Sequence, residues 1–96
     1  MKLRVEVTAE DIAKGERGMG CNCAIAHALR RAGYPSPFVQ PWGAPKRGPF
    51  IRLDVDDDSL IDLPSGAALL ARLWDEGDKI APFAFEIEVP DTAVSE

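Results

Sequence analysis

The sequence predicts an α+β fold in which two main helices pack on one face of a small, mainly antiparallel sheet. Three short segments alternate apolar and charged residues, which is the period-two pattern of strands with one buried face. Two longer segments place apolar residues at helical spacing and end at glycines. Because no repeat or linker divides the chain, we expect one domain over residues 1–90 and a loose tail over residues 91–96.

A strand and a short helix are predicted at the N-terminus. Apolar residues at positions 3, 5 and 7 alternate with charged residues, which predicts a strand over residues 2–7. Thr8 suits an N-cap, and Asp11 stands at the spacing of a capping box, so one helical turn is expected to follow. Gly15 is expected to end this turn in the left-handed conformation.

The main N-terminal helix is predicted over residues 20–32 and carries both cysteines, the only histidine and an arginine pair. Gly33 is placed to terminate it. Cys23, His27 and Arg31 share one stripe of this helix, so we expect that stripe to be positively charged.

The middle of the chain is predicted to be a loop followed by a β-hairpin. Residues 34–49 contain five prolines, which restricts regular structure to a short edge strand at 38–40. Alternating runs at 51–55 and 60–63 flank an acidic turn at 56–59 and predict the two strands of the hairpin.

The second main helix is predicted to begin with Ser65 as its N-cap and to end at Gly77. Arg72 and Glu76 are one turn apart, so we expect them to pair. Its predicted buried stripe consists of Leu69, Leu70, Leu73 and Trp74.

The last strand is predicted over residues 83–89, between two prolines, at the centre of the sheet. Its acidic residues would face Lys2 and Arg4 if the two terminal strands are neighbours.

The net charge of −5 conceals two oppositely charged halves. Residues 14–52 carry seven basic residues against one acid, whereas residues 53–96 carry two against twelve. Either the halves neutralise each other in the fold, or a basic patch lies on an acidic body. The second interpretation favours a compact anion over a long nucleic acid, which the overall field would repel.

The expected environment is the cytoplasm. No apolar run approaches the about 20 residues of a membrane span, and the N-terminus has no apolar signal region. Cys21 and Cys23 are too close for an unstrained disulfide, so we expect reduced thiols.

The segment GERGMG and the loop PWGAPKRGPF predict a binding site for an anion. Glycines ahead of a helix let backbone N–H groups approach an anion, and an aromatic plate beside cations suits a base and its phosphates. The alternative is that the glycines serve tight turns and close packing and that the tryptophan covers the core edge. The predicted ligand-binding residues are Arg17, Gly18, Gly20, His27, Arg30, Arg31, Trp42, Lys46 and Arg47.

Other chemistries are excluded by spacing. The glycines match neither a Walker A loop nor the dinucleotide fingerprint. On one helix Cys21 and Cys23 point in nearly opposite directions, so zinc would need donors from elsewhere, and no partner orients a Cys–His nucleophile. The acidic run at 54–59 lacks the glycine and glutamate of a calcium loop. We therefore predict no catalytic residue, no metal and no cofactor, and the protein is not expected to be an enzyme.

At VTAEDIAKG, CAIAHAL and WDEGDKIAPFAFEIEVP the chain resembles a family of small uncharacterised bacteriophage and bacterial proteins. Its CNC spacing is narrower than in that family, which argues against an inherited metal role. The resemblance implies a phage-type accessory protein, with anti-defence activity through binding a component of the host.

Two hypotheses follow. The first is a non-enzymatic module that sequesters a small anionic, nucleotide-like ligand, such as a nucleotide immune signal. We expect a homo-oligomer in this case, because a chain of 96 residues has little room for an internal pocket. The alternative is an acidic inhibitor that binds a host defence or nucleic-acid-binding protein through a surface including Asp56, Asp57 and Asp58.

Overall fold

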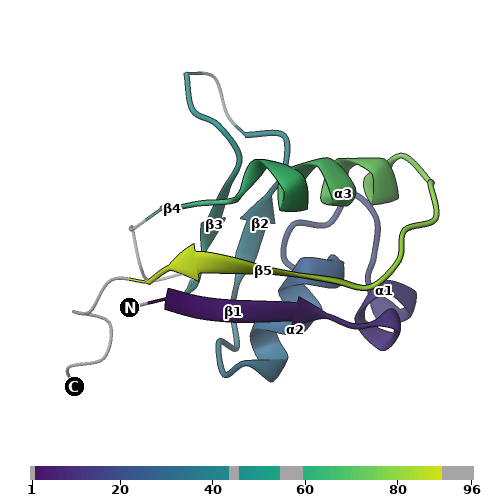
Figure 1. Ribbon diagram of the computed structural model, residues 1–96, viewed down its shortest axis with the longest axis horizontal. Coiled ribbons are helices and arrows are strands. Elements are labelled where there is room, and N and C mark those ends of the chain that lie inside the picture. The colour runs from purple at the N-terminus through teal and green to yellow at the C-terminus, as the bar shows by residue number, and fades with distance from the viewer. Residues whose placement is uncertain (1, 44–45, 55–59, 90–96) are drawn as a thin grey trace.

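The computed structural model describes residues 2–43, 46–54 and 60–89. The described chain is a mixture of helices and antiparallel strands, as predicted (Figure 1). In chain order the elements are β1 (Lys2–Val7), α1 (Ala9–Lys14), α2 (Ala24–Arg31), β2 (Phe38–Gln40), β3 (Phe50–Arg52), β4 (Ile61–Asp62), α3 (Ser65–Asp75) and β5 (Phe83–Glu88).

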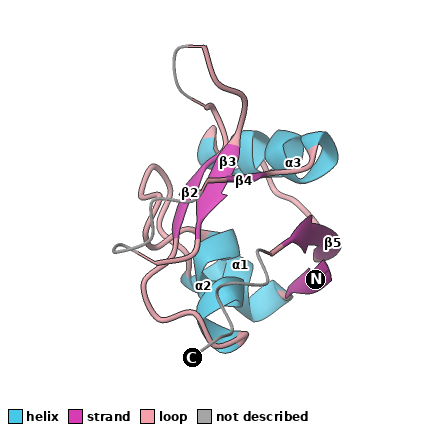
Figure 2. Cartoon of the chain, turned by 90° about the vertical axis from the view of Figure 1, so that its left-hand side faces the viewer, coloured by secondary structure: helices cyan, strands magenta, loops and turns pink. Residues whose placement is uncertain are grey.

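The strands divide into two sheets where one sheet was expected. β1 pairs with β5, and β2, β3 and β4 form a second sheet with β3 in the middle (Figure 2). The predicted hairpin and the edge strand at 38–40 are therefore confirmed, whereas the central position predicted for β5 is wrong. The physical reason for two separate sheets lies in β4, which has only two residues. Pro64 follows it after one further residue and has no N–H with which to extend a ladder.

The terminal strands are neighbours, and their register matches the predicted charge pairing. Lys2 lies opposite Glu88 and Arg4 lies opposite Glu86 on the outer face. The inner face buries Val5 and other apolar side chains against the helices. Alternation of charge and apolarity along both strands thus determines which face becomes core.

The core face of α3 consists of small residues and one tryptophan. Ala67, Ala68, Ala71 and Trp74 are buried, while Leu69 is 51% exposed. The predicted buried stripe is therefore confirmed at Trp74 and wrong at Leu69, while Leu70 and Leu73 are half-buried. Both sets have helical spacing, and the alanine face permits closer packing of the helix.

Three predicted helix ends need correction: the starts of α2 and α3, and the conformation of Gly15 at the end of α1. α2 begins at Ala24, with Cys23 as N-cap, so both cysteines precede the helix. The delay arises because residues 16–22 form their own turn, in which Asn22 N–H donates to Met19 O at 2.9 Å and Glu16 N–H donates to Asn22 O at 2.8 Å. In α3, Pro64 is the N-cap and Ser65 is already helical.

Gly15 ends α1 in an extended conformation, at φ −67° and ψ 153°, and not in the predicted left-handed one. Its lack of a side chain serves close packing, because a Cβ there would lie 2.6 Å from the backbone nitrogen of Ala24. Gly33 does adopt the predicted positive φ, at +111°. The predicted turn at 56–59 and the predicted tail at 91–96 lie outside the described residues.

Candidate functional site

The glycine-rich link is bound to the end of α3. Arg17 Nε donates to the carbonyl of Trp74 at 2.5 Å, and its guanidinium lies 4.9 Å from the centre of the Trp74 ring. The N–H of Gly18 donates to Asp75 Oδ1 at 3.1 Å. The backbone donor expected to receive a ligand anion is thus paired with a carboxylate of the protein itself.

Close packing and turn geometry explain two glycines of this link. Gly18 has φ +79°, a conformation that side chains disfavour. Gly20 lies against β2, where its carbonyl accepts from Val39 N–H at 2.9 Å and a Cβ would lie 2.6 Å from Val39 O. These contacts support the alternative interpretation, in which the glycines of the link serve tight turns and close packing.

Arg30 folds back over the turn that precedes its own helix. Its Nη1 donates to Asn22 Oδ1 at 3.1 Å, and its Nη2 donates to the carbonyl of Cys21. Asn22 in turn donates to the carboxylate of Glu16. The guanidinium of Arg30 therefore stabilises the turn that precedes α2.

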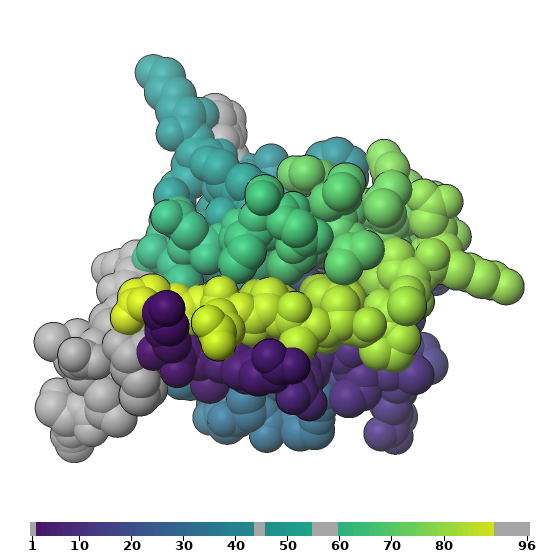
Figure 3. Space-filling view, viewed as in Figure 1, coloured from purple at the N-terminus to yellow at the C-terminus, as the bar shows by residue number. Residues whose placement is uncertain are grey.

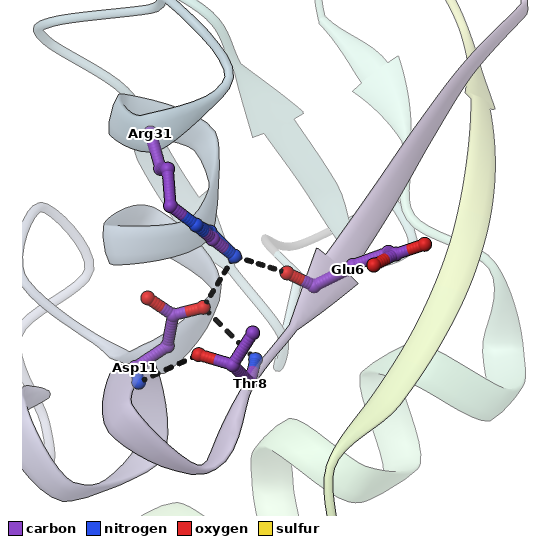
Figure 4. Close-up of polar contacts among 4 residues, drawn as sticks. All are labelled: Glu6, Thr8, Asp11 and Arg31. Carbon is purple, nitrogen blue, oxygen red and sulfur yellow. Dashed lines mark hydrogen bonds and ion pairs between the residues drawn. The ribbon is translucent and has the colours of Figure 1, made fainter.

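Arg31 joins α2 to the start of the chain (Figure 4). Its Nη2 lies 2.8 Å from Asp11 Oδ2 and donates to the carbonyl of Glu6 at 2.6 Å. The same Asp11 oxygen accepts from Thr8 N–H at 2.9 Å, and Thr8 Oγ1 accepts from Asp11 N–H at 3.2 Å. Asp11 thus serves a complete capping box and an ion pair at once.

The Cys23 and His27 side chains form no metal site. The described part of the chain contains no group of three or more His, Cys, Asp or Glu side chains that could hold a metal ion. Cys23 is buried and its thiol donates to Gly20 O at 3.9 Å. Burial raises the pKa of this thiol, against an opposing contribution from the N–H groups of Ala26 and Ile25. Cys23 is therefore a neutral capping residue, while Cys21 is exposed.

A different group of residues gathers around Trp42, which is 55% exposed. The guanidinium of Arg72 lies 5.7 Å from the centre of the Trp42 ring, and its Nη1 donates to the carbonyl of Pro41 at 3.1 Å. Sequence reasoning missed Arg72 as a site residue, since it was expected to pair with Glu76 along α3. An arginine on the polar face of the predicted helix was the one feature of the sequence that could have indicated a site residue.

Lys46 and Arg47 belong to the same loop between β2 and β3 as Trp42. A Cβ on Gly43, the residue after Trp42, would lie 2.5 Å from Arg47 O, so the backbones of Gly43 and Arg47 are in contact. Arg47 Nη2 lies 3.1 Å from Asp62 Oδ1, and its guanidinium lies 5.4 Å from the centre of the Phe50 ring. Lys46 is exposed at a positive φ of 65°. We call Trp42, Lys46, Arg47 and Arg72 the Trp42 surface.

The structure distributes the nine predicted residues among several places. Arg17 and Gly18 contact the end of α3, Gly20 contacts β2, and Arg31 contacts β1 and α1. His27 and Arg30 lie on α2, where His27 Nε2 is buried and has no hydrogen-bond partner within the described ranges. Trp42, Lys46 and Arg47 lie in the loop between β2 and β3. The nine predicted residues therefore do not gather in one place, and the Trp42 surface is the candidate site that remains.

In residues 2–43, 46–54 and 60–89, no helix is long and apolar enough to cross a membrane. Comparison of the chain with models of protein families, with curated proteins and with solved structures finds no match.

Proposed function

We propose that this protein is a non-enzymatic binding module that takes a small anionic, nucleotide-like ligand at the Trp42 surface. The observation that carries the proposal is the exposed Trp42 ring with the Arg72 guanidinium beside it. An indole plate stacks on a nucleobase, and a guanidinium beside it binds a phosphate.

The anchoring of Arg72 supports this assignment. A guanidinium has five N–H donors, and the contact to Pro41 O uses Nη1. This contact fixes the position of the cation beside the ring, which lowers the entropy lost when a ligand binds. Lys46 and Arg47 add positive charge in the same loop between β2 and β3.

The exposure of the tryptophan supports the choice of this surface over the glycine link. Arg17 and Arg72 each lie over a tryptophan ring and each donate to a backbone carbonyl. Trp74 beside Arg17 is 2% exposed, whereas Trp42 beside Arg72 is 55% exposed, so a ligand can reach only the second ring.

Isothermal calorimetry with mononucleotides, dinucleotides and cyclic nucleotides tests the proposal. The resemblance to phage proteins makes cyclic nucleotide signals the first compounds to use. We expect binding that weakens as salt is added, because the phosphate contacts are exposed. Trp42→Ala and Arg72→Ala are expected to weaken binding at least about tenfold, since base stacking alone contributes about 1–3 kcal/mol.

Arg17→Ala is the matched control, because it also removes an arginine that lies over a tryptophan ring. It is expected to lower stability and leave affinity unchanged. An absence of heat with every compound on folded protein would contradict the proposal, as would a loss of binding in Arg17→Ala alone.

A further inference from the structure

The outer edge of β1 has no strand neighbour among the described residues. β1 pairs with β5 on one side. On the other side the carbonyl of Glu6 accepts from Arg31 Nη2, so it points away from β5. In an antiparallel strand the N–H and C=O of one residue point to the same side, and that side alternates along the strand. Lys2, Arg4 and Glu6 therefore direct their backbone groups outward.

A groove follows this edge. It has a volume of about 250 Å³ and lies between Arg4, Val5 and Glu6 of β1 and the last turns of α2. The helix side contributes Ala28 and Ala32, whose small side chains leave space beside the strand, and Arg31, whose Nη2 donates to Glu6 O at this edge. In Figure 3 the purple atoms of β1 lie at the surface between the yellow atoms of β5 and the blue atoms of α2. The edge is thus accessible to a further extended strand.

We propose that this edge pairs with β1 of a second copy of the chain, which gives a symmetric dimer with the strand order β5–β1–β1–β5. An unpaired edge is a template for another strand, and natural proteins usually block it with charges. In β1 the exposed charges have both signs, in an order that complements itself when the strand is reversed. Within one copy Arg4 Nε lies 3.1 Å from Glu6 Oε2, so pairing of two copies would bring two such exposed ion pairs together.

Charge selects the register of this pairing. Hydrogen-bonded pairs must join residues whose backbone groups point outward, so only a few symmetric registers remain. One places Arg4 opposite Glu6 of the second copy, and symmetry repeats this contact. The two neighbouring registers set Arg4 against Arg4, together with Lys2 against Glu6, or Glu6 against Glu6, and the next register sets Lys2 against Arg4. Each of these places like charges opposite each other.

The apolar face agrees with the same register. In this register Val5 lies opposite its own copy at the symmetry axis and Leu3 lies opposite Val7. Val5 and Val7 are already 1% exposed in one copy, whereas Leu3 is only partly buried, so Leu3 is the apolar side chain of the strand that the second copy would cover. Arg31 need not give up its hydrogen bond to Glu6 O, because a carbonyl oxygen has two lone pairs and can also accept from the second copy.

The inference is independent of the proposed ligand. β1 crosses the lower half of Figure 1, whereas residues 46–49 rise at its upper left. A dimer through β1 would leave both Trp42 surfaces open.

Sedimentation velocity over a concentration series up to the millimolar range tests the proposal. We expect the wild-type protein to dimerise. Arg4→Glu and Glu6→Arg each replace two attractive contacts with two repulsive ones, so each is expected to raise the dimer dissociation constant at least about tenfold. A mixture of the two variants is expected to form a heterodimer, because both contacts then join opposite charges.

Lys2→Glu is the matched control for Arg4→Glu. It changes the charge equally and also creates one repulsive contact with β5, since Lys2 faces Glu88 as Arg4 faces Glu86. The control is expected to stay dimeric. Circular dichroism establishes that each variant is folded. A wild-type monomer, a dimer that survives Arg4→Glu, or equal loss in Lys2→Glu would overturn the proposal.

Discussion

Replacing Asp11 with alanine tests whether the contacts between β1, α1 and α2 stabilise the fold. Asp11 is 8% exposed, and one of its oxygens accepts from Thr8 N–H and from Arg31. Loss of a capping interaction costs about 1 kcal/mol. Loss of a charge-assisted hydrogen bond costs about 1.5–3 kcal/mol, and the lower end applies because the Arg31 side chain is 48% exposed.

We therefore expect Asp11→Ala to lower the free energy of unfolding by about 2–3 kcal/mol. In a domain of this size the melting temperature falls by about 10–20 °C. Urea unfolding followed by circular dichroism measures the change, and an unaltered dependence on urea shows that the unfolded state is the same.

Two further variants separate the contributions. Asp11→Asn keeps an acceptor for Thr8 N–H and loses the charge, so it is expected to cost about 1 kcal/mol. Thr8→Ala removes the capping hydroxyl and keeps the ion pair, at a similar cost of about 1 kcal/mol. If Asp11→Ala changed the unfolding free energy by less than about 0.5 kcal/mol, the stabilising role inferred from these distances would be refuted.

Further variants, a labelling reaction and a pH series each test a separate contact. Gly15→Ala is expected to destabilise the protein by about 1–3 kcal/mol, because its Cβ would lie 2.6 Å from a backbone nitrogen of α2. Gly66→Ala places its Cβ in open space, so it is expected to stabilise α3 by about 0.5–1 kcal/mol in the same urea assay. Leu69→Ser is expected to change stability by less than about 0.5 kcal/mol, and a larger loss would show that the alanine face of α3 is not the buried one. Iodoacetamide with mass spectrometry is expected to label exposed Cys21 long before buried Cys23. Burial raises the pKa of the Cys23 thiol above its ordinary value of 9.0. The unfolded state therefore loses this proton at a lower pH than the folded state, and stability is expected to fall as the pH rises above that value. Replacing Cys23 with alanine is expected to remove this dependence.

Local sequence patterns were sufficient wherever neighbouring residues make the contacts. Thr8 and Asp11 are three residues apart and form the predicted capping box. Strict alternation predicted β1 and β5. The acids of the last strand were expected to face Lys2 and Arg4 if the two strands were neighbours, and Lys2 does lie opposite Glu88. Gly33 and the hairpin strands β3 and β4 followed from the same kind of evidence.

The partners of the long cationic side chains were decided by tertiary structure alone. Arg17 contacts Trp74, which is 57 residues away, and Arg72 contacts Pro41, which is 31 residues away. An arginine reaches several ångströms in many directions, so its position in the sequence does not specify its acceptor. For this reason the basic segment was predicted as one pocket, whereas most of its arginines join elements of the fold.

The choice of buried face in α3 also needed the assembled structure. Leucines at 69, 70 and 73 and alanines at 67, 68 and 71 both match a helical stripe. Periodicity measures hydrophobic spacing, and it does not measure how near the opposing elements lie. Close packing selected the alanine face and left Leu69 exposed. The sequence by itself thus determined the α+β class, the Thr8 capping box and the two terminal strands. Only the tertiary structure decided the partners of the arginines and left Trp42 exposed, because those outcomes depend on contacts between residues distant in the chain.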